Sequence, residues 1–371
     1  MKSFGIIAEF NPFHLGHKYL IDRAREETGS NVCVAVMSGN FIQRGGSAVY
    51  DKWKRAELAI QGGVNLVIEL PAVYATASAE HFAFGGVKTL EALGCVDTLV
   101  FGSESGNLDE LQRTAFILKK REDELLEIIS RMSREGMSFP KAREEAVRQI
   151  APELKSDVLR EPNNILAVEY LKQLEHMKPY TVKRIGQGHH ESATALRDRL
   201  AAAEPEKFRR AEENYFNLVR SRILQSSPDT LEKMCAVGDG LENRLKDSVR
   251  FAKNTDDLIK KVKSKAYTYS SVERLLAHIV LGIESDYDKG PGYIRVVGFD
   301  EKGAGLLKKI KREDCCSLPV ITNINKEWDK LGDGQAMIEK DILATDVFNV
   351  IWSRNMYTES DYVKKPVIVR C

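Results

Sequence analysis

The sequence predicts an α/β protein: a Rossmann-like, doubly wound parallel sheet followed by a mainly helical α+β C-terminal domain. Three observations lead to this fold class. Continuous apolar runs, typical of strands buried on both faces, alternate with helical patterns through residues 1–105. A polar turn follows the first of these runs, at the strand end where open α/β sheets bind ligands. From residue 205 to about 281 the pattern is mainly helical.

The individual elements follow from this alternation. The apolar runs that we expect to be strands cover residues 4–9, 31–37, 66–70, 98–101, 181–185, 293–299 and 318–324. The expected helices cover residues 18–28, 51–61, 79–93, 165–174, 192–203 and 304–311. Parallel strands need crossover connections, and these are right-handed, so helices should cover both faces of the sheet.

The length of 371 residues fits two domains. We expect a sheet domain over residues 1–205 and a C-terminal domain over residues 206–371. Charged helical positions dominate from about residue 107, as in Lys119-Lys120-Arg121-Glu122, which predicts a helical insertion at about 107–160.

Charge and composition exclude several classes of protein. The 55 basic and 54 acidic residues give a net charge of +1, which excludes a charge-coated protein but not a local basic face. No apolar run approaches the roughly 20 residues of a membrane span, and no signal peptide is evident, so we expect a cytoplasmic protein without a membrane partner. None of the six cysteines forms a Cys-x-x-Cys pair, and the sequence predicts no metal site in the protein.

The strongest local signal is the His-x-Gly-His element His14-Leu15-Gly16-His17, between the first expected strand and helix. A helix N-terminus offers unpaired N–H groups to phosphate, and glycine allows close approach of a nucleotide. The two imidazoles could donate hydrogen bonds to phosphate oxygens, and Lys18 could add positive charge. The alternative is a loop with two surface histidines.

A second element, His189-His190-Glu191-Ser192-Ala193-Thr194-Ala195-Leu196-Arg197, follows the fifth expected strand. It resembles the Ile-Ser-x-Thr-x-Ile-Arg motif of the nucleotidyltransferase superfamily, with Glu191 in place of the first Ile. Ser192 could cap a helix and bind phosphate, and Arg197 could reach the same anion. The alternative is an N-capped helix with a surface arginine. A P-loop and the Lys-Met-Ser-Lys-Ser motif are absent.

Longer stretches resemble the bacterial tRNA(Met) cytidine acetate ligases, which are nucleotidyltransferases of the His-x-Gly-His type. The matching segments are residues 4–17, 37–46, 51–55, 69–71, 101–104, 162–166 and 293–299. The resemblance therefore covers most of the chain. It implies that residues 1–205 form an ATP-binding catalytic domain and that residues 206–371 bind tRNA.

The resemblance also implies an activity and a set of site residues. Members of the family activate acetate with ATP as acetyl-adenylate, releasing pyrophosphate. They then transfer acetyl to N4 of the wobble cytidine of elongator tRNA(Met), and Mg²⁺ should accompany ATP. The expected catalytic residues are His14, His17, Lys18, Ser192 and Arg197. The expected ATP-binding residues are Ile7, Ala8, Glu9, Phe10, Asn11, Pro12, Phe13, His14, Leu15, Gly16, His17, Lys18, Tyr19, Leu20, Gly102, Asn163, Asn164 and Arg184, with Asn164 preferred over Asn163.

Three basic stretches are candidate RNA contacts. They are residues 244–265, residues 302–312, and a smaller cluster of Gln43, Arg44, Lys52, Lys54 and Arg55. Trp53 and Tyr267 could stack on bases, although core packing is the favoured role for Trp53. For each stretch taken alone, a solvated helix face is the simpler interpretation.

Two other functions remain open at this stage. A small-molecule adenylyltransferase, acting on a mononucleotide or phosphopantetheine, would account for both phosphate motifs. This function would not explain the large C-terminal region. A non-catalytic tRNA-binding protein would keep the fold without the chemistry.

Overall fold

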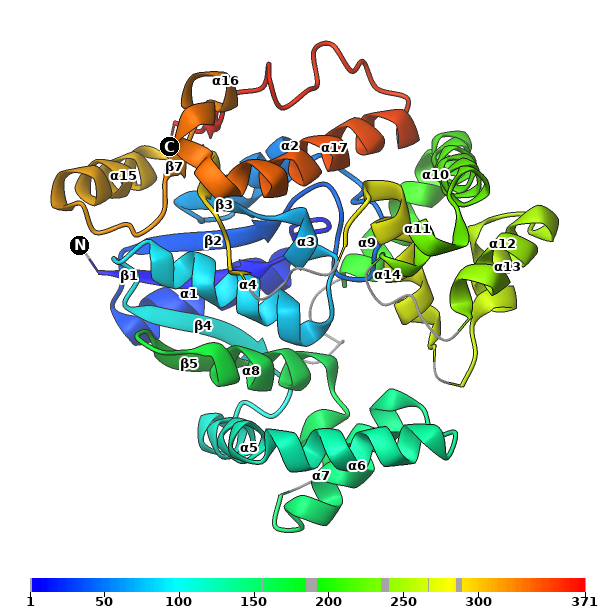
Figure 1. Cartoon of the computed structure of the whole chain (residues 1–371). Helices are drawn as coiled ribbons and strands as arrows, with labels where there is room; N and C mark the ends of the chain where they lie inside the picture. Colours follow the sequence, from blue (N-terminus) through cyan, green and yellow to red (C-terminus); the bar gives the residue numbers. More distant parts are fainter. Residues whose placement is uncertain are drawn as a thin grey trace.

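The computed structural model describes residues 2–154, 156–184, 192–234, 240–265, 267–284 and 289–370 (Figure 1). It confirms the predicted fold class: a mostly parallel sheet lies between helices, and a further group of helices packs beside it. Within these described ranges, no helix has the length and apolar character needed to cross a membrane.

The parallel part of the sheet comes from the first half of the chain. Its strands are β1 (Ser3–Ala8), β2 (Val32–Ser38), β3 (Leu66–Leu70), β4 (Thr98–Ser103) and β5 (Lys178–Lys183). They lie in the order β5-β4-β1-β2-β3, and each adjacent pair is parallel. The order reverses between β1 and β4, which makes this the switch point where doubly wound sheets bind ligands.

Helices bury both faces of this sheet, which explains the continuous apolar runs. Alternate residues of β2 enter different cores, so that Val34 faces one core and Ala35 the other. Helices α1 (Leu15–Thr28) and α2 (Lys52–Gln61) pack on the Ala35 face. Helices α4 (Ala79–Ala92) and α8 (Pro162–Gln173) pack on the Val34 face.

The second half of the chain, expected as a C-terminal domain over residues 206–371, contributes strands to the same sheet. Strand β6 (Ile294–Phe299) pairs antiparallel with β3, and β7 (Val320–Ile321) and β8 (Val367–Ile368) both pair with β6. Helix α15 (Glu301–Glu313) packs on the same core as α4. A boundary at residue 205 therefore does not separate two sheets, because the partner of a strand is chosen by tertiary contacts that its own sequence does not encode.

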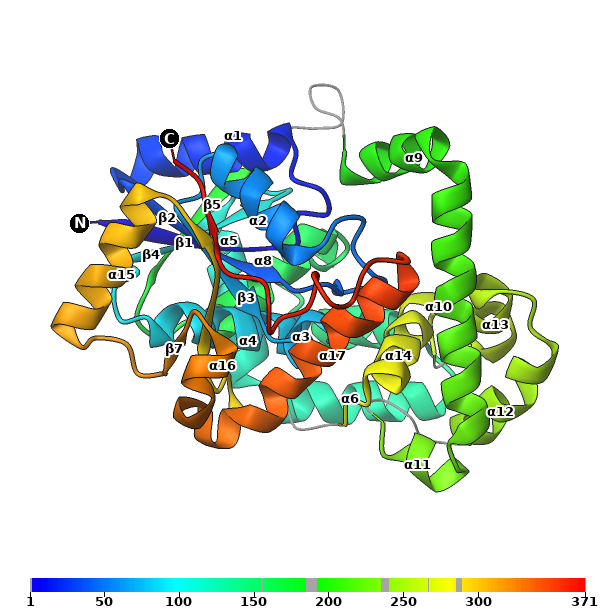
Figure 2. The same ribbon diagram turned by 90° about the horizontal axis from the view of Figure 1, so that it is seen from above.

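Two groups of helices complete the molecule. The first occupies the segment of the expected insertion, with α5 (Leu108–Lys120), α6 (Glu122–Arg134), α7 (Phe139–Ile150) and the 3₁₀ turn η1 (Ser156–Leu159) packed on α8. The second has a core of its own. It comprises α9 (Ala193–Ala203), α10 (Pro205–Gln225), α11 (Pro228–Glu232), α12 (Leu241–Phe251), α13 (Thr255–Val262) and α14 (Tyr269–Leu281). We call this second group the helical unit; its long helix α10 connects α9 to the others (Figure 2).

The helical unit is joined to the sheet by a helix and a loop. Helix α17 (Gln335–Ile351) contacts α10 and α14 on one side and the short helix α3 (Ala72–Ala75) on the other. The loop of residues 39–48, which follows β2, packs on α14. At Gly45, where φ is +92°, a Cβ would lie 2.6 Å from the backbone of Arg274. Only glycine permits this approach, so the loop holds the helical unit beside the sheet.

Candidate active site

A cavity of about 650 Å³ lies at the carboxyl ends of β1, β4 and β5. Its volume is in the range of small-molecule sites, and its position is the switch point of the sheet. Most of the residues expected from the sequence line it: Ile7, Ala8, Glu9, Phe10, His14, Gly16, His17, Tyr19, Leu20, Gly102, Asn163, Arg184, Ser192 and Arg197. Outside its wall lie Asn11, Pro12, Phe13, Leu15, Lys18 and Asn164.

The two histidines of the His-x-Gly-His element form the N-terminal cap of α1. His14 is the N-cap residue, and its Nδ1 accepts a hydrogen bond from the Gly16 N–H at 3.0 Å. Nδ1 of His17 accepts in turn from the His14 N–H at 3.2 Å, and the two rings stack with centroids 3.7 Å apart. A nitrogen that accepts carries no proton, so the neutral rings carry theirs on Nε2. The cap therefore makes both Nε2 atoms hydrogen-bond donors.

Gly16 is required by this cap. A Cβ at residue 16 would lie 2.9 Å from Cε1 and 3.0 Å from Nδ1 of the His14 ring. The sequence suggested that glycine is there to admit a nucleotide; the structure adds that any larger residue would displace the His14 imidazole. The glycine thus fixes the direction in which His14 presents its donor.

His17 is held neutral by its surroundings. Burial lowers the pKa of its imidazole well below the ordinary value of 6.5, and His14 and Arg184 lower it further. The edge of the Phe10 ring meets the His17 ring at a centroid distance of 4.9 Å, and Phe13 lies at 5.5 Å. A neutral imidazole in an aromatic setting is a hydrogen-bond donor of fixed orientation at neutral pH.

The second expected motif meets the first at the cavity. Ser192 is the N-cap of α9, and its Oγ accepts from the Ala195 N–H at 3.2 Å. Arg197 donates from Nη1 to the Asn11 carbonyl at 2.8 Å and from Nη2 to Oγ1 of Thr194 at 3.0 Å. The start of α9 is thereby tied to the loop after β1, although 186 positions separate Asn11 from Arg197. The residues before Ser192 in this motif, His189, His190 and Glu191, and the preceding Gly186-Gln187-Gly188, lie outside the described residues.

The two adjacent asparagines of α8 have different surroundings. Asn164 is buried, and its Oδ1 accepts from the Glu104 and Ser105 N–H groups at 3.0 and 3.2 Å, so its side chain holds the loop after β4. Asn163 lines the cavity, and its Oδ1 accepts from Nη1 of Arg184 at 3.2 Å. The structure thus brings Asn163 to the ligand side, where the sequence favoured Asn164, because neighbouring positions on a helix point about 100° apart.

Three of the expected basic groups lie elsewhere than the sequence suggested. Lys18 points to Asp22, with an Nζ–Oδ2 distance of 3.0 Å, and is half exposed outside the cavity wall. Lys52 and Arg55, expected in a basic RNA-binding cluster, are fully buried. Burial lowers the pKa of Arg55 to about 10, and its guanidinium donates to the backbone carbonyls of Glu9, Ser38 and Tyr50. Lys52 and Arg55 are therefore structural cations. Of the cations in that cluster, Lys54 and Arg44 are the two that are exposed at the surface.

Lys52 belongs to a buried ion network that joins β3, β6 and the C-terminal segment. Its Nζ lies 2.8 Å from Oε1 of Glu69 and 2.8 Å from Oδ1 of Asp361. Arg295 completes the network through Asp361 and Glu69. Burial raises the pKa of Asp361, but Arg295 and Lys52 outweigh this effect and hold it below its ordinary value.

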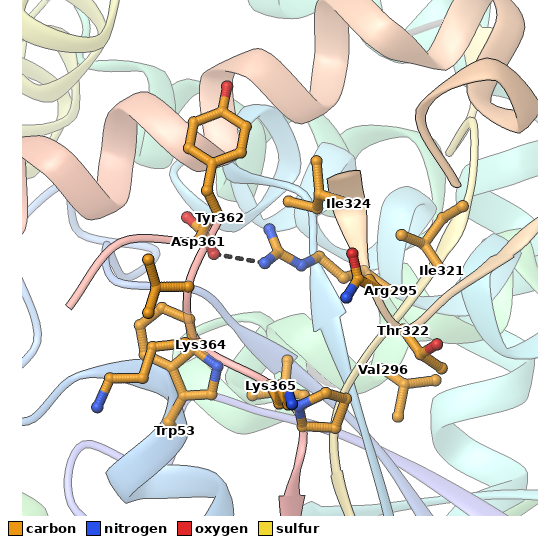
Figure 3. Close-up of a pocket in the computed structure, with 14 residues that line it drawn as sticks. Trp53, Arg295, Val296, Ile321, Thr322, Ile324, Asp361, Tyr362, Lys364 and Lys365 are labelled. Atoms are coloured by element: carbon orange, nitrogen blue, oxygen red, sulfur yellow. Dashed lines mark hydrogen bonds and ion pairs between the residues drawn. The ribbon is translucent and has the colours of Figure 1, made fainter. Parts of the chain in front are cut away.

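A second, much smaller cavity of about 70 Å³ lies against this network (Figure 3). Figure 3 shows the Arg295–Asp361 pair beside Trp53, Tyr362 and Lys364. Trp53 is only 6% exposed, and the Lys364 ammonium lies 5.7 Å from its ring centroid. Trp53 is therefore a core residue covered by the C-terminal segment, as the sequence favoured.

Some cavity residues were not among the expected ATP-binding or catalytic residues. They include Gln43 and Arg44 after β2, Phe101 and Glu104 around the end of β4, Tyr170 on α8, and Lys183 at the end of β5. Five of these residues lie near or after the carboxyl ends of parallel strands. The rule that ligands bind at these ends could therefore have identified them from the sequence. Tyr170 has no such signal, because its position depends on how α8 packs.

Comparisons with known proteins identify the family of this chain. The family model described as HIGH Nucleotidyl Transferase matches residues 1–362. The tRNA(Met) cytidine acetate ligase of Caldanaerobacter subterraneus subsp. tengcongensis is 38% identical over 98% of both chains, and that of Clostridium perfringens strain SM101 is 33% identical over the whole of both chains. The crystal structure of Thermotoga maritima TmcAL bound with alpha-thio ATP superposes with a TM-score of 0.89 at 32% identity, covering 100% of both chains. The chain therefore belongs to the HIGH nucleotidyl transferase family, and within it to the tRNA(Met) cytidine acetate ligases.

Proposed function

We propose that this chain is an ATP-dependent ligase that activates acetate as acetyl-adenylate and transfers the acetyl group to N4 of the wobble cytidine of elongator tRNA(Met). The observation that carries the proposal is the cap of α1, whose hydrogen bonds at Nδ1 leave the Nε2 atoms of two imidazoles to face a nucleotide-sized cavity as donors. Relatives that match the whole chain bear the name of this activity, and a similar structure binds an ATP analogue.

The first half-reaction joins acetate to the α-phosphate of ATP. An acetate oxygen attacks that phosphorus while the bond to pyrophosphate breaks, and negative charge grows on the phosphate oxygens. The Nε2–H groups of His14 and His17 would donate to these oxygens, and the positive end of α1 would add to the stabilisation. Ser192 and Arg197, at the start of α9, lie on the same cavity wall and would hold the departing pyrophosphate.

The nucleoside part of ATP would lie toward β4 and β5. Gly102 lies near the end of β4. A Cβ there would be 3.4 Å from the Arg184 side chain, so there is little space between residue 102 and Arg184. Asn163 and Arg184 are hydrogen-bonded to each other at the same edge. Phe82, Phe101 and Leu166 supply apolar surface to the cavity that would suit a purine.

Mg²⁺ would enter as part of the ATP substrate. Across the described residues, no three His, Cys, Asp or Glu side chains gather in a metal-binding group. Both oxygens of Glu104, which lines the cavity, accept hydrogen bonds from Asn163 and Asn164. The triphosphate and water would therefore supply the ligands of Mg²⁺, as is common for this ion, and we assign no step to a protein-bound metal.

The second substrate must reach the cavity as a base turned out of a single-stranded loop. The helical unit borders the cavity through α9, and the loop of residues 39–48, which packs on α14, lines the same cavity. Exposed Arg250 and Lys260 lie on α12 and α13, and exposed Lys253 and Lys263 flank α13. We assign the tRNA to this side. ATP, acetate and tRNA are all cytoplasmic, so the proposed reaction belongs to the cytoplasm.

The test is an in vitro reaction with ATP, labelled acetate and unmodified elongator tRNA(Met), followed by mass spectrometry of the nucleosides. We expect labelled N4-acetylcytidine at a single position, and none when ATP or acetate is omitted. A folded, ATP-binding protein that leaves the tRNA unmodified would contradict the proposal. Turnover that ignores tRNA and consumes a phosphorylated small molecule would indicate an adenylyltransferase instead.

A further inference from the structure

The transfer step needs a group that accepts a proton, and this inference rests on the proposed function. When N4 of cytidine attacks the acetyl carbon, a C–N bond forms and the C–O bond to AMP breaks. N4 loses one proton in the process, and AMP leaves with the electron pair of the broken bond. The side chains that line the cavity can be taken in turn to find the acceptor.

Neither histidine can take this proton in the observed arrangement. The acceptor nitrogens of His14 and His17 are both Nδ1, and both are occupied by backbone N–H groups. Their Nε2 atoms already carry protons. The phenol of Tyr170 also stays protonated, because burial and the nearby Glu9 raise its pKa. Within the described part of the chain, we therefore look for the proton acceptor among the carboxylates that line the cavity.

Among the described residues, three glutamates line the cavity: Glu9, Glu104 and Glu161. Both oxygens of Glu104 accept hydrogen bonds from α8, so this residue is committed to holding the loop after β4. Glu161 is exposed to solvent at the start of α8, where its side chain does not cap the helix. Of these three described carboxylates, Glu9 is the one that is neither exposed nor fully occupied by hydrogen bonds.

Glu9 is well placed for the task. It follows the last residue of β1, five positions before His14, so it shares the strand end that presents the catalytic cap. Its Oε1 accepts from the Gln43 N–H at 2.9 Å, which orients the carboxylate, and within the described residues no donor bonds to its Oε2. One oxygen thus fixes the group and the other remains available to a substrate amine.

The electrostatic setting of Glu9 contains opposing effects. Burial raises the pKa of the carboxyl above its ordinary value of 4.5, and the Gln43 N–H, Arg44, Arg55 and Arg197 counteract this. Among the described residues, its charged or titratable neighbours are Arg44 in the loop after β2, Arg55 on α2, Arg197 on α9 and Tyr170 on α8. The net pKa remains raised, which makes the carboxylate a better base at neutral pH.

We propose that Glu9 is the general base of the transfer step, a catalytic residue whose Oε2 takes the N4 proton of cytidine as the acetyl group moves from AMP to nitrogen. Adenylation needs no such acceptor, because acetate attacks as an anion. The two half-reactions should therefore differ in their dependence on Glu9.

The experiment compares Glu9→Gln with wild type in each half-reaction. Gln keeps an oxygen for the Gln43 N–H but cannot take a proton. The first half-reaction is followed as acetate-dependent exchange of pyrophosphate into ATP. The second is followed by adding tRNA to enzyme preloaded with acetyl-adenylate. We expect exchange to stay within about 3-fold of wild type and transfer to fall by about 10²-fold or more. Glu26→Gln, on the exposed side of α1, is the matched control and should change neither rate.

The pH profile gives a second readout. In wild type the transfer rate should rise with pH as Glu9 ionises, and this acid limb should disappear in Glu9→Gln. Equal losses in both half-reactions, or no loss in transfer, would overturn the proposal. If Glu9→Gln does not fold, the wild-type profiles decide: an acid limb in transfer but not in exchange supports Glu9, and its absence overturns it. A wild-type enzyme that makes no N4-acetylcytidine would instead contradict the proposed function itself.

Discussion

At the residue scale, the central feature is a helix cap built from two imidazoles. Most N-caps use Ser, Thr, Asp or Asn, whose short side chains satisfy the first backbone N–H groups of the helix. Here His14 and His17 do this with Nδ1 and so direct both Nε2–H groups away from the backbone. Structure and proposed chemistry are therefore coupled, because the bonds that cap α1 also set the tautomer that would donate to phosphate.

Replacing His17 with Ala should remove one donor from the phosphate site. We expect the rate of acetate-dependent pyrophosphate exchange to fall about 10²–10³-fold, the usual effect of losing one preorganised donor. The unfolding free energy should fall by only about 1 kcal/mol, because one capping hydrogen bond is lost. His176→Ala is the control, since that side chain is 82% exposed and should leave exchange unchanged. An H17A rate within 3-fold of wild type would refute the donor role.

The depressed pKa of His17 predicts a pH effect on stability. The unfolded chain binds a proton at this imidazole as pH falls through its ordinary value of 6.5, whereas the folded protein does not until much lower pH. His17 should therefore destabilise the fold progressively below pH 6.5, by up to about 1.4 kcal/mol per pH unit. Urea unfolding from pH 7.5 to 5 should show a steeper loss in wild type than in His17→Ala. Parallel curves would contradict the neutral imidazole.

The sequence identifies the two histidines of the cavity, but it does not show which other side chains face the cavity. His14, His17, Ser192 and Arg197 stand out because their residue types and spacing are unusual at strand-to-helix junctions. Lys18 follows the first motif and Asn164 lies in the family-like segment 162–166, yet neither lines the cavity, because Lys18 pairs with Asp22 and Asn164 holds the loop after β4. Which side of a helix faces a ligand depends on how that helix packs, and short motifs do not specify packing.

At the scale of elements, the strand ends and the loops after them form the site. Strands buried on both faces are predictable because their apolar runs are continuous and glycine or proline ends them. Helix α1 begins three residues earlier than expected, at Leu15, because the histidine cap starts it. Strand β5 also starts earlier, at Lys178, where pairing with β4 compensates for a polar sequence.

The adjacent residues Asn163 and Asn164 offer a test of how α8 supports the loop after β4. Asn164→Ala should leave the Glu104 and Ser105 N–H groups without their acceptor and cost about 1–3 kcal/mol of unfolding free energy. Asn163→Ala, its matched partner, should instead raise the KM for ATP about 10-fold or less while costing under about 1 kcal/mol. Thermal unfolding and exchange kinetics measure both. A reversed pattern would show that Asn164 contacts ATP.

The buried network around Lys52 should be a major support of the extended sheet. Lys52→Met would remove one of the two cations that Glu69 and Asp361 share and leave only Arg295, and we expect a loss of about 3–5 kcal/mol. Lys54→Met, two positions further on the same helix, removes an exposed pair with Glu57 and should cost about 0–1 kcal/mol. Chemical denaturation of both variants checks this. Equal stabilities would mean that the network contributes nothing to β3–β6 pairing.

At the scale of the whole molecule, one sheet unites segments from both halves of the chain. The sequence predicts the strands at residues 293–299 and 318–324 but not that they extend the N-terminal sheet, since register and partner emerge only on packing. The cavity lies between that sheet and the helical unit, and it is lined by α9 of this unit and by the loop of residues 39–48. This arrangement would place a nucleotide on the sheet and leave the helical side open to a large second substrate.

The near-neutral net charge of the protein is consistent with a tRNA substrate. Basic and acidic groups are interleaved, so local basic groups can contact RNA although the total charge is small. The basic stretches at residues 244–265 and 302–312 lie at opposite ends of the molecule, on α12–α13 and α15 (Figure 1). Several of their cations pair with acids on the same helix, as Lys260 does with Asp256 at 2.6 Å. We expect tRNA to depend on a few local contacts and on shape more than on overall charge.

The central claim, that acetate is activated on ATP and delivered to tRNA, is tested most directly with acetate labelled in both oxygens with ¹⁸O. Attack of acetate on the α-phosphate leaves one labelled oxygen bonded to phosphorus. The account therefore predicts one ¹⁸O atom in AMP for each N4-acetylcytidine formed, with the other retained in the acetyl group. AMP without label, formation of ADP, or unmodified tRNA in a reaction that consumes ATP would contradict it.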